Sequence, residues 1–297
     1  MREVKVITDS CSDLTGELLE RYNLDYARMT TVCEGKETPA LLTWSPQEAH
    51  ALYETMRNEK RVTTAQVPTE EFNRIFTKYL EKGCDIVYVG CSLKQSGSVN
   101  TGQVAAQALL KKYPGAKISC IDSQNASYGE GMLAIEAAKM AADGKGVDEI
   151  TSHITLIRKT VQQYVTVHTL EYLKNAGRVS ASSAFFGNLM GVKPILISDV
   201  NGVQTAVKKV KGRQNSFKEI VSLLKENIID SENQTIYVAH SDCTSAELDS
   251  IVNLIRSEIP CRDIHVGYIG PIIGASIGPD AVGIWGFGNR VAYCMEE

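Results

Sequence analysis

The stretch Asp85-Ile86-Val87-Tyr88-Val89-Gly90-Cys91 decides the fold of this chain. Its interior is almost continuously apolar, which is typical of a strand buried on both faces of a parallel sheet. A polar loop over residues 92–98 follows, and then a segment of helical character that we expect to run to about Tyr113. A buried strand, a polar loop and a helix in succession form the repeating unit of an α/β fold.

The same succession occurs on both sides of this stretch. Residues 4–8 and 117–122 are predicted strands, and each leads through a polar loop into a predicted helix. This repetition places parallel strands in one sheet with helices on its faces. We therefore predict an α/β protein in which residues 1–146 form an N-terminal, parallel-sheet, Rossmann-like domain that carries the rim of a ligand site. Gly144-Lys145-Gly146 marks its end.

The succession changes after residue 146. We predict helices over residues 147–163, 170–175, 180–190, 217–229 and 245–258, and strands over residues 164–169, 234–239 and 264–269. Two further strand-like segments, residues 193–199 and 203–209, flank Val200-Asn201-Gly202, and Asn-Gly is a strong hairpin signal. Residues 147–297 are therefore expected to form a second α+β domain with a β-hairpin.

A glycine-rich segment near the end of the chain has the sequence Gly270-Pro271-Ile272-Ile273-Gly274-Ala275-Ser276-Ile277-Gly278-Pro279. Glycine and proline disfavour the interiors of helices and strands, so we expect an apolar loop. Because glycine has no Cβ, such a loop can approach a ligand or another segment closely. We expect this last segment to return to the ligand site, although a tight turn that only packs is an equal alternative.

Length, charge and composition exclude several classes of protein. The 297 residues suggest about two domains, and the net charge of −4 argues against a general nucleic-acid binder. No apolar run approaches the roughly 18–20 residues that span a bilayer, so we expect no stable membrane insertion. The N-terminus lacks the apolar core of a signal peptide, which predicts a cytoplasmic protein.

The cysteines and histidines give no sign of a metal site. Eight cysteines are scattered without any C-x-x-C pair, and several lie in apolar, strand-like runs. The five histidines show no ligand spacing with cysteines or carboxylates. We therefore predict reduced, buried thiols and no bound metal.

Hydroxyl-rich segments follow the predicted strands of the first half. In open parallel sheets ligands bind at the carboxyl ends of the strands, so these segments should converge on one rim. Ser96-Gly97-Ser98 directly precedes a predicted helix, whose free N–H groups favour an anion. Thr63-Thr64 adds hydroxyls from a predicted loop. The cluster lacks lysine and arginine, so it suits one carboxylate or small oxyanion better than a polyphosphate. Helix capping is the alternative role of each hydroxyl.

Three other motifs resemble functional sites but have simpler explanations. Gly129-Glu130-Gly131-Met132-Leu133-Ala134 matches G-x-G-x-x-A but lies too far after its strand for a dinucleotide site. His240-Ser241-Asp242 are adjacent in sequence, whereas a catalytic triad is assembled from distant segments. The basic run at residues 208–213 indicates a solvated face, or alternatively a docking site for an acidic or phosphorylated partner.

Six segments, in order along nearly the whole chain, form a recognisable set. They are Ile7-Thr8-Asp9-Ser10-Cys11-Ser12-Asp13-Leu14, Thr63-Thr64-Ala65-Gln66, Ser96-Gly97-Ser98, the segment from Asp122-Ser123 through Gly129-Glu130-Gly131, Leu170-Glu171-Tyr172-Leu173-Lys174-Asn175-Ala176-Gly177-Arg178-Val179-Ser180, and the Gly270 to Gly278 segment. Each is a weak signal by itself. Together they resemble the DegV family of bacterial fatty-acid-binding proteins.

The resemblance implies a two-domain α/β protein that binds one long-chain fatty acid of the palmitate, stearate or oleate class and no other cofactor. The acyl chain would lie in an apolar tunnel, and the carboxylate would meet hydroxyls. The matching hydroxyl positions are Thr64 and Ser96, with Thr63 and Ser98 close enough in sequence to help. Arg178 matches the family arginine near the head group. The last glycine-rich segment would contribute Gly274 and Ser276.

Some members of the family present their fatty acid to a fatty-acid kinase, which phosphorylates the carboxylate. Those members carry a histidine in the last glycine-rich segment, where this chain has Ser276, and Asp280 replaces a glycine of the same pattern. The family motif T-S-Q-P-S is also altered, to Thr64-Ala65-Gln66-Val67-Pro68. Serine cannot take up a proton near neutral pH. These departures are compatible with fatty-acid binding and weigh against a kinase partner.

A function from another class is a stand-alone hydrolase with Ser96 as the nucleophile. Such an enzyme needs a general base next to the serine, and no residue of this sequence can be named for that role. We therefore predict a lipid-binding carrier protein that is not an enzyme by itself.

Overall fold

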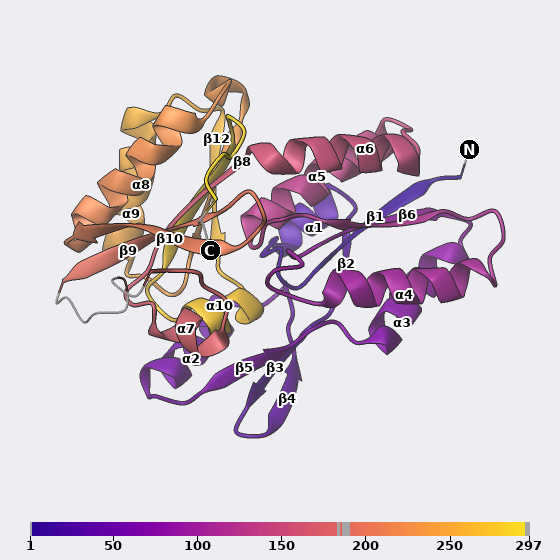
Figure 1. Cartoon of the computed structure of the whole chain (residues 1–297), viewed down its shortest axis with the longest axis horizontal. Coiled ribbons are helices and arrows are strands. Elements are labelled where there is room, and N and C mark those ends of the chain that lie inside the picture. The colour runs from indigo at the N-terminus through magenta and orange to yellow at the C-terminus, as the bar shows by residue number, and fades with distance from the viewer. Residues whose placement is uncertain (1, 183–184, 186–190, 295–297) are drawn as a thin grey trace.

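The computed structural model describes residues 2–182, 185 and 191–294 (Figure 1). The strands are β1 (Val4–Asp9), β2 (Asp25–Ala27), β3 (Thr30–Cys33), β4 (Lys36–Pro39), β5 (Val62–Ala65), β6 (Asp85–Gly90), β7 (Ile118–Asp122), β8 (Val161–Thr166), β9 (Val192–Ser198), β10 (Gln204–Lys211), β11 (Thr235–His240), β12 (Asp263–Tyr268) and β13 (Val282–Phe287). The helices are α1 (Gly16–Arg21), α2 (Pro46–Arg57), α3 (Thr69–Leu80), α4 (Ser98–Leu110), α5 (Tyr128–Ala142), α6 (Val147–Ile157), α7 (Glu171–Ala176), α8 (Arg213–Asn227), α9 (Ser245–Glu258) and α10 (Pro271–Ile277), with short 3-10 helices at Arg158–Thr160 and Ser231–Asn233.

The first sheet has the order β2-β1-β6-β7, and all its strands are parallel, which confirms the predicted parallel sheet. Strand β6 is buried along its whole length. Its side chains alternate between two cores, because Ile86 and Tyr88 pack with α3 and α4, whereas Val87 and Val89 pack with α5. The continuous apolar run at residues 85–91 therefore reflects helices on both faces of the sheet.

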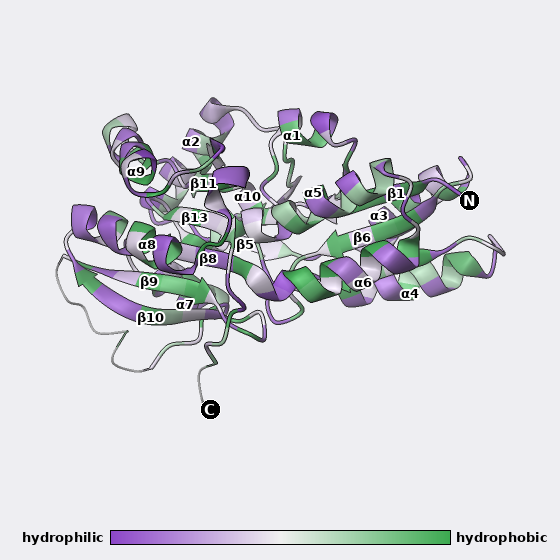
Figure 2. Ribbon diagram, turned by 90° about the horizontal axis from the view of Figure 1, so that it is seen from above, coloured by the Kyte–Doolittle hydropathy of each residue, from purple (hydrophilic) through white to green (hydrophobic). Residues whose placement is uncertain are grey.

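The second sheet is six-stranded and mixed, with the order β10-β9-β8-β13-β11-β12. Strands β9 and β10 form the predicted antiparallel hairpin, in which Ser198 pairs with Gln204. Strands β11 and β12 are parallel and are connected through α9. Helices α8 and α9 cover one face of this sheet, and Figure 2 shows hydrophilic residues along α8 beside a hydrophobic β9. The α/β fold class with a second, mixed-sheet part is thus confirmed.

Strand β13 was not anticipated from the sequence. It lies in the middle of the second sheet, antiparallel to both β8 and β11. Its sequence, Val282-Gly283-Ile284-Trp285-Gly286-Phe287, contains two glycines, which weaken a strand signal. A Cβ at Gly283 would overlap the ring of Trp285, so the glycine makes room for that ring.

Residues 63 and 64 were predicted to lie in a loop, and this prediction is wrong. They belong to β5, which pairs with β3 in a three-stranded antiparallel sheet, β4-β3-β5. The pairs Thr31–Thr64 and Val32–Thr63 fix the register. The strand is four residues long and its partner is distant in sequence, so local pattern alone does not indicate it.

The glycine-rich segment was predicted to be a loop, and it is a helix. Helix α10 spans Pro271–Ile277, with Gly270 as its N-cap and Gly278, at φ +81°, as its C-cap. Proline is favoured in the first turn and glycine just past the end, so these residues delimit the helix instead of breaking it.

Three further boundaries differ from the sequence predictions. The predicted helix over residues 147–163 ends at Ile157 and gives way to β8 at Val161. Most of the predicted helix over residues 180–190 lies outside the described residues, and Ser180 makes an isolated bridge to Thr205. Helix α6 packs against α5 and β7, on the first sheet, although residue 147 was taken as the start of the second domain. The division at residue 146 stays a prediction.

One hydrophobic core joins the two large sheets. It includes Val87 of β6, Met132 of α5, and Val165 and Trp285 of the second sheet. Helix α5 therefore lies between the sheets and contacts β1 on one side and β8, β11 and β13 on the other. Among the described residues, no helix has the length and apolar character needed to cross a bilayer.

Candidate functional site

A cavity of about 250 Å³ lies between the first sheet, the second sheet and α10. Its apolar lining comes from both halves of the chain. The apolar side chains are Met29, Ala126, Val165, Leu173, Leu196, Ile269, Ile272, Ile273, Ile277 and Trp285. A cavity with such side chains can bury an apolar ligand. The complex is then stabilised in proportion to the apolar area that binding removes from water.

Hydroxyl groups gather at one end of this cavity. Thr64 of β5, Ser96 of the loop after β6 and Ser276 of α10 all line it, as does Arg178. A second, more polar hollow of about 540 Å³ shares Thr64, Arg178 and Ser276 with the cavity. The shared residues therefore mark the mouth of the cavity, where the apolar interior meets the polar outside. Three of the predicted site residues, Thr64, Arg178 and Ser276, therefore lie at this mouth, and a fourth, Ser96, lines the cavity.

Ser96 is held in place by its neighbour Ser98. The two Oγ atoms lie 3.0 Å apart in a hydrogen bond, and the Ser98 backbone N–H donates to the Ser96 Oγ at 3.3 Å. Ser98 is buried, and its Oγ accepts a hydrogen bond from Val67 N. Ser98 does not line the cavity. Through these hydrogen bonds it positions both Ser96 and the segment after β5. Helix α4 begins at Ser98, which the prediction placed at the end of the preceding loop.

Arg178 is tied to the loop that carries Ser96. Its Nε donates to the carbonyl of Gln95 at 2.8 Å, and its Nη1 donates to the carbonyl of Ala176. Gly177, at φ +65°, ends α7 in the left-handed conformation and turns the chain toward the mouth. The exposed guanidinium group thus places a positive charge beside the hydroxyls.

Helix α10 forms one wall of the cavity through Ile272, Ile273, Ser276 and Ile277, which share a helix face. Gly274 lies elsewhere on the helix and lines neither cavity nor outer hollow. A Cβ on Gly274 would overlap the hydroxyl of Tyr53. Gly274 thus makes room for Tyr53, and its ligand role stays a prediction.

Residues 274–278 match the pattern G-x-S-x-G, in which the serine of many hydrolases sits at a sharp turn between a strand and a helix. Here Ser276 lies inside α10, so the backbone context of that pattern is not present. None of the described residues that line the cavity is a histidine, aspartate or glutamate. Neither Ser276 nor Ser96 therefore has a general base within this lining.

Thr63 faces the outer hollow and does not line the inner cavity. Its Oγ1 donates to the carbonyl of Val32 at 3.4 Å, across the β3–β5 pair. Thr64 also lines the outer hollow, but of the two threonines only Thr64 reaches the inner cavity. Of the two predicted threonines, Thr64 is the one at the mouth.

A polar group that no sequence pattern indicated also lines the cavity. Gln163 Nε2 donates to Gln204 Oε1 at 2.6 Å, and Trp285 Nε1 donates to Gln163 Oε1 at 3.3 Å. The three residues come from β8, β10 and β13. No sequence signal could have found them, because Gln163 was predicted to end a helix and β13 was missed.

A buried carboxyl group lies at the start of α10. Asp13 Oδ1 accepts a hydrogen bond from Gly270 N at 2.9 Å, and Asp13 Oδ2 accepts one from the Ser127 hydroxyl at 2.5 Å. Burial raises the pKa of Asp13 to about 7, against the lowering effect of these two hydrogen bonds. Asp13 links the segment after β1 to α5 and α10, two of the elements around the cavity.

The remaining motifs have structural roles. His240 accepts a hydrogen bond from Cys243 N and stacks on Tyr268, and the Ser241 Oγ accepts one from Ala281 N. Asp242 pairs with Arg57 of α2 at 2.6 Å. In the basic run after the hairpin, Lys208 pairs with Glu219 and Arg213 pairs with Glu247.

The chain is similar in sequence to known proteins over nearly its whole length. The family model described as an uncharacterised protein of the DegV family matches residues 3–287. A DegV domain-containing protein of Clostridium perfringens is 32% identical over 290 residues, which cover 97% of this chain and 99% of the relative. Another DegV domain-containing protein, of Streptococcus pyogenes, is 29% identical over 288 residues and covers 96% of this chain and 98% of the relative.

Solved structures share the fold over almost the full length. A DegV lipid-binding protein from Thermotoga maritima has a TM-score of 0.85 at 24% identity and covers 98% of this chain and 100% of its own. A DegV family protein from Thermus thermophilus, described by its fatty-acid binding, has a TM-score of 0.85 at 25% identity and covers 96% of this chain and 99% of its own. The architecture described above is therefore that of a known set of structures.

Proposed function

This chain belongs to the DegV family, and on that premise we propose that it binds one long-chain fatty acid. The acyl chain would lie in the apolar cavity between the sheets, and the carboxylate would lie at the mouth, near Thr64 and Ser96. The observation that carries this proposal is the cavity itself, whose lining combines many apolar side chains with the hydroxyls of Thr64, Ser96 and Ser276 and the guanidinium group of Arg178.

The energetics of such a ligand fit the two parts of the site. Burial of each acyl CH₂ group contributes roughly 0.8 kcal/mol, so a long chain supplies most of the affinity. A carboxylate loses its hydration on entry and needs hydrogen bonds in return. Hydroxyl donors on Thr64, Ser96 and Ser276 can provide them, and Arg178 offers an opposite charge. The isoleucine, leucine and valine side chains of the lining suit the tail.

Solved relatives support the chemical class of the ligand. A DegV family structure from Eubacterium eligens carries heptadecanoic acid, and one from Ruminococcus gnavus is described with vaccenic acid. We extend this class to palmitate, stearate or oleate in the present chain. We further propose a carrier role in the cytoplasm, in which the protein binds the fatty acid without transforming it.

The first test is direct. Purified protein is extracted with organic solvent, and the extract is examined by mass spectrometry, while the stripped protein is titrated with oleate. We expect one equivalent of a long-chain fatty acid. Absence of copurified lipid after gentle purification, together with no binding of added oleate or palmitate, would reject the proposal.

Substitutions at the mouth test the placement of the carboxylate. Ser96→Ala and Thr64→Val each remove one donor to a charged group, which is worth about 1.5–3 kcal/mol and predicts roughly 10- to 100-fold weaker oleate binding. Ser222→Ala, on the exposed surface of α8, is the matched control and should bind as the parent does. The melting temperature of each variant separates loss of binding from loss of folding.

A second candidate role is presentation of the fatty acid to a fatty-acid kinase for acyl-phosphate formation. The outer hollow favours it in one respect, because Lys60, Arg61 and Arg178 line it beside Ser276 and could attract phosphate groups. Ser276 itself supplies no imidazole. Formation of acyl phosphate with a competent partner kinase would support this role, and no turnover with such a kinase would remove it.

A further inference from the structure

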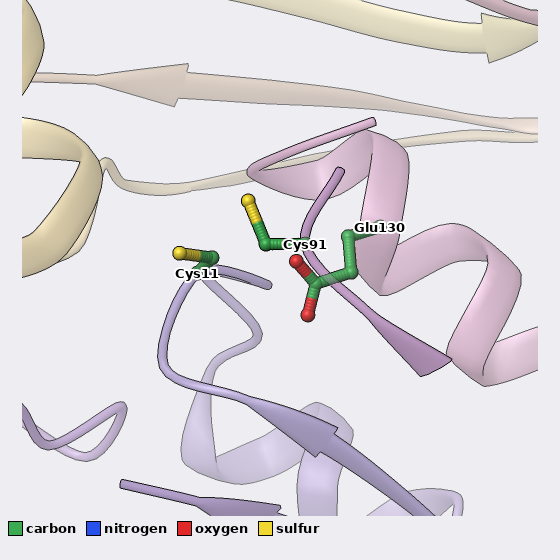
Figure 3. Close-up of side chains that lie close together, drawn as sticks. All are labelled: Cys11, Cys91 and Glu130. Atoms are coloured by element: carbon green, nitrogen blue, oxygen red, sulfur yellow. The ribbon is translucent and has the colours of Figure 1, made fainter. Parts of the chain in front are cut away.

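Three side chains that could bind a metal ion converge at the wall of the cavity, although they are far apart in sequence. Cys11 follows β1, Cys91 follows β6, and Glu130 lies in the first turn of α5 (Figure 3). All three are buried, with exposed fractions of 2%, 1% and 0%. The two Sγ atoms and one Glu130 carboxylate oxygen lie within 4.8 Å of one another.

Glu130 has an oxygen without a partner at this place. Its Oε1 accepts hydrogen bonds from Thr8 Oγ1 at 2.7 Å and from Asp9 N at 3.4 Å. Its Oε2 is fully buried and has no hydrogen-bond partner among the described residues. Buried polar atoms are almost always paired, and an orphan of this kind is expected where a water molecule or an ion binds.

We propose that Cys11 Sγ, Cys91 Sγ and the Glu130 carboxylate bind one zinc ion. Zinc combines thiolate and carboxylate ligands, whereas calcium and magnesium take oxygen ligands. Tetrahedral zinc, with Zn–S bonds of about 2.3 Å, holds two thiolates about 3.8 Å apart. Ligand atoms within 4.8 Å therefore reach this geometry through small side-chain rotations.

A fourth acidic side chain, Asp9, lies beside the cluster. Asp9 is also buried there and accepts hydrogen bonds from Cys11 N, Cys91 N and the Tyr88 hydroxyl. On binding, the two thiols and the Glu130 carboxyl would release their protons to solvent.

The ion would lie in the wall of the cavity. Cys11 and Cys91 line the cavity, whereas Glu130 approaches from α5. Three protein ligands leave the fourth tetrahedral position for a water molecule on the cavity side. The zinc site is thus separate from the hydroxyls at the mouth, and its test does not depend on fatty-acid binding.

The test uses the full-length protein, kept reduced and stripped of metal with a chelator. Cobalt(II) is titrated as the spectroscopic probe, because thiolate ligands give it a charge-transfer absorption, and Zn²⁺ is then added as the competitor. We expect one equivalent of Co²⁺ with thiolate absorption, displaced by one equivalent of Zn²⁺. Proton release on Zn²⁺ addition is measured in weakly buffered solution.

Variants identify the ligands. Cys11→Ser, Cys91→Ser and Glu130→Gln should each weaken Zn²⁺ binding at least 10-fold, the lower bound of what loss of even an outer-shell partner costs. Cys120→Ser, on β7 and outside the cluster, is the matched control and should bind as the parent does. Circular dichroism checks the fold of each variant. Glutamine has nearly the same shape as glutamate, so Glu130→Gln still tests the site if a cysteine variant unfolds.

Several outcomes would overturn the proposal. These are a parent protein without thiolate absorption on Co²⁺ addition, undiminished Zn²⁺ binding in a Cys11→Ser, Cys91→Ser double variant, and loss of binding in Cys120→Ser. A disulfide between Cys11 and Cys91 that persists in the reducing buffer would also contradict it.

Discussion

Ser96 shows how a site residue depends on a neighbour that the ligand does not reach. Ser96 lines the cavity, while Ser98 behind it supplies a hydrogen bond and holds Val67 N as well. Both serines were predicted to bind ligand, because hydroxyls before a helix suit an anion. Sequence could not separate them, since the separation depends on which hydroxyl points inward at the start of α4.

The raised pKa of Asp13 leads to a prediction about pH. Because its pKa is about 7 in the folded protein and near 3.8 when unfolded, the folded state binds the proton more tightly. The free energy of unfolding should therefore fall as pH rises from about 4 to 7, by up to about 1.4 kcal/mol per pH unit from this residue. Asp13→Asn resembles the protonated form and should remove that part of the slope.

The measurement is urea unfolding of the parent and the Asp13→Asn variant at pH 5, 6, 7 and 8. The difference in their free energies of unfolding isolates Asp13 from other buried carboxyls such as Asp9 and Glu130. Asp143→Asn, at the exposed end of α5, serves as the control. Parallel pH profiles for the parent and Asp13→Asn would contradict the assignment.

Helix α10 illustrates where reasoning from sequence failed and why. Pro271 and the flanking glycines delimit the helix, and the interior Gly274 is required by the approach of Tyr53. Composition counts glycines but does not reveal whether each one breaks a helix or makes room for a neighbour. The prediction that this segment returns to the site rests on its apolar character, and Ile272, Ile273 and Ser276 do line the cavity.

Gly274→Ala tests this role of glycine. Alanine would favour the helix by about 1 kcal/mol, but its Cβ would overlap the Tyr53 hydroxyl, which donates to the carbonyl of Ile269 at 2.6 Å. We expect a net loss of about 1–3 kcal/mol in the free energy of unfolding, measured in urea. Gly16→Ala in α1 is the control, because its Cβ would meet only ordinary contact with Thr43.

A double-mutant cycle identifies the cause. Tyr53→Phe removes the hydroxyl, so the Gly274→Ala, Tyr53→Phe double variant should lose less stability than the sum of the single losses. Strict additivity would mean that the overlap with Tyr53 is not the reason for the glycine.

The strands differ in how far sequence could identify them. Strand β6 was predicted well because it is buried on both faces and therefore continuously apolar. Strand β5 was missed because its partner β3 is remote and its four residues carry little pattern. The same limit hid Gln163, Gln204 and the Cys11–Cys91–Glu130 cluster, which exist only where distant segments meet. The hydroxyls at Thr64 and Ser96 could be proposed because each stands next to a recognisable segment.

The two halves of the molecule share one core and one cavity, which predicts a common response to ligand. A ligand at 100 times its dissociation constant stabilises the folded state by about 2.7 kcal/mol. Because α5 packs between the sheets and both halves line the cavity, we expect oleate to shift a single unfolding transition.

The two tryptophans allow this to be measured. Trp44→Phe leaves Trp285 of the second sheet as the fluorescent reporter, and far-ultraviolet circular dichroism follows the whole chain. Both signals should give the same midpoint with and without oleate. Two separate transitions, of which oleate shifts only one, would show that the halves unfold independently.

The central place of β13 has a consequence for how the protein is made. A ribosome delivers residues in order, so β1, β2, β6 and β7 can close the first sheet long before residue 282 emerges. Until then, β10-β9-β8 and β11-β12 remain two fragments whose facing edges, on β8 and β11, lack their shared neighbour. Unpaired edges of this kind invite aggregation. The nascent chain should therefore be prone to aggregation until β13 has been synthesised and pairs with both β8 and β11.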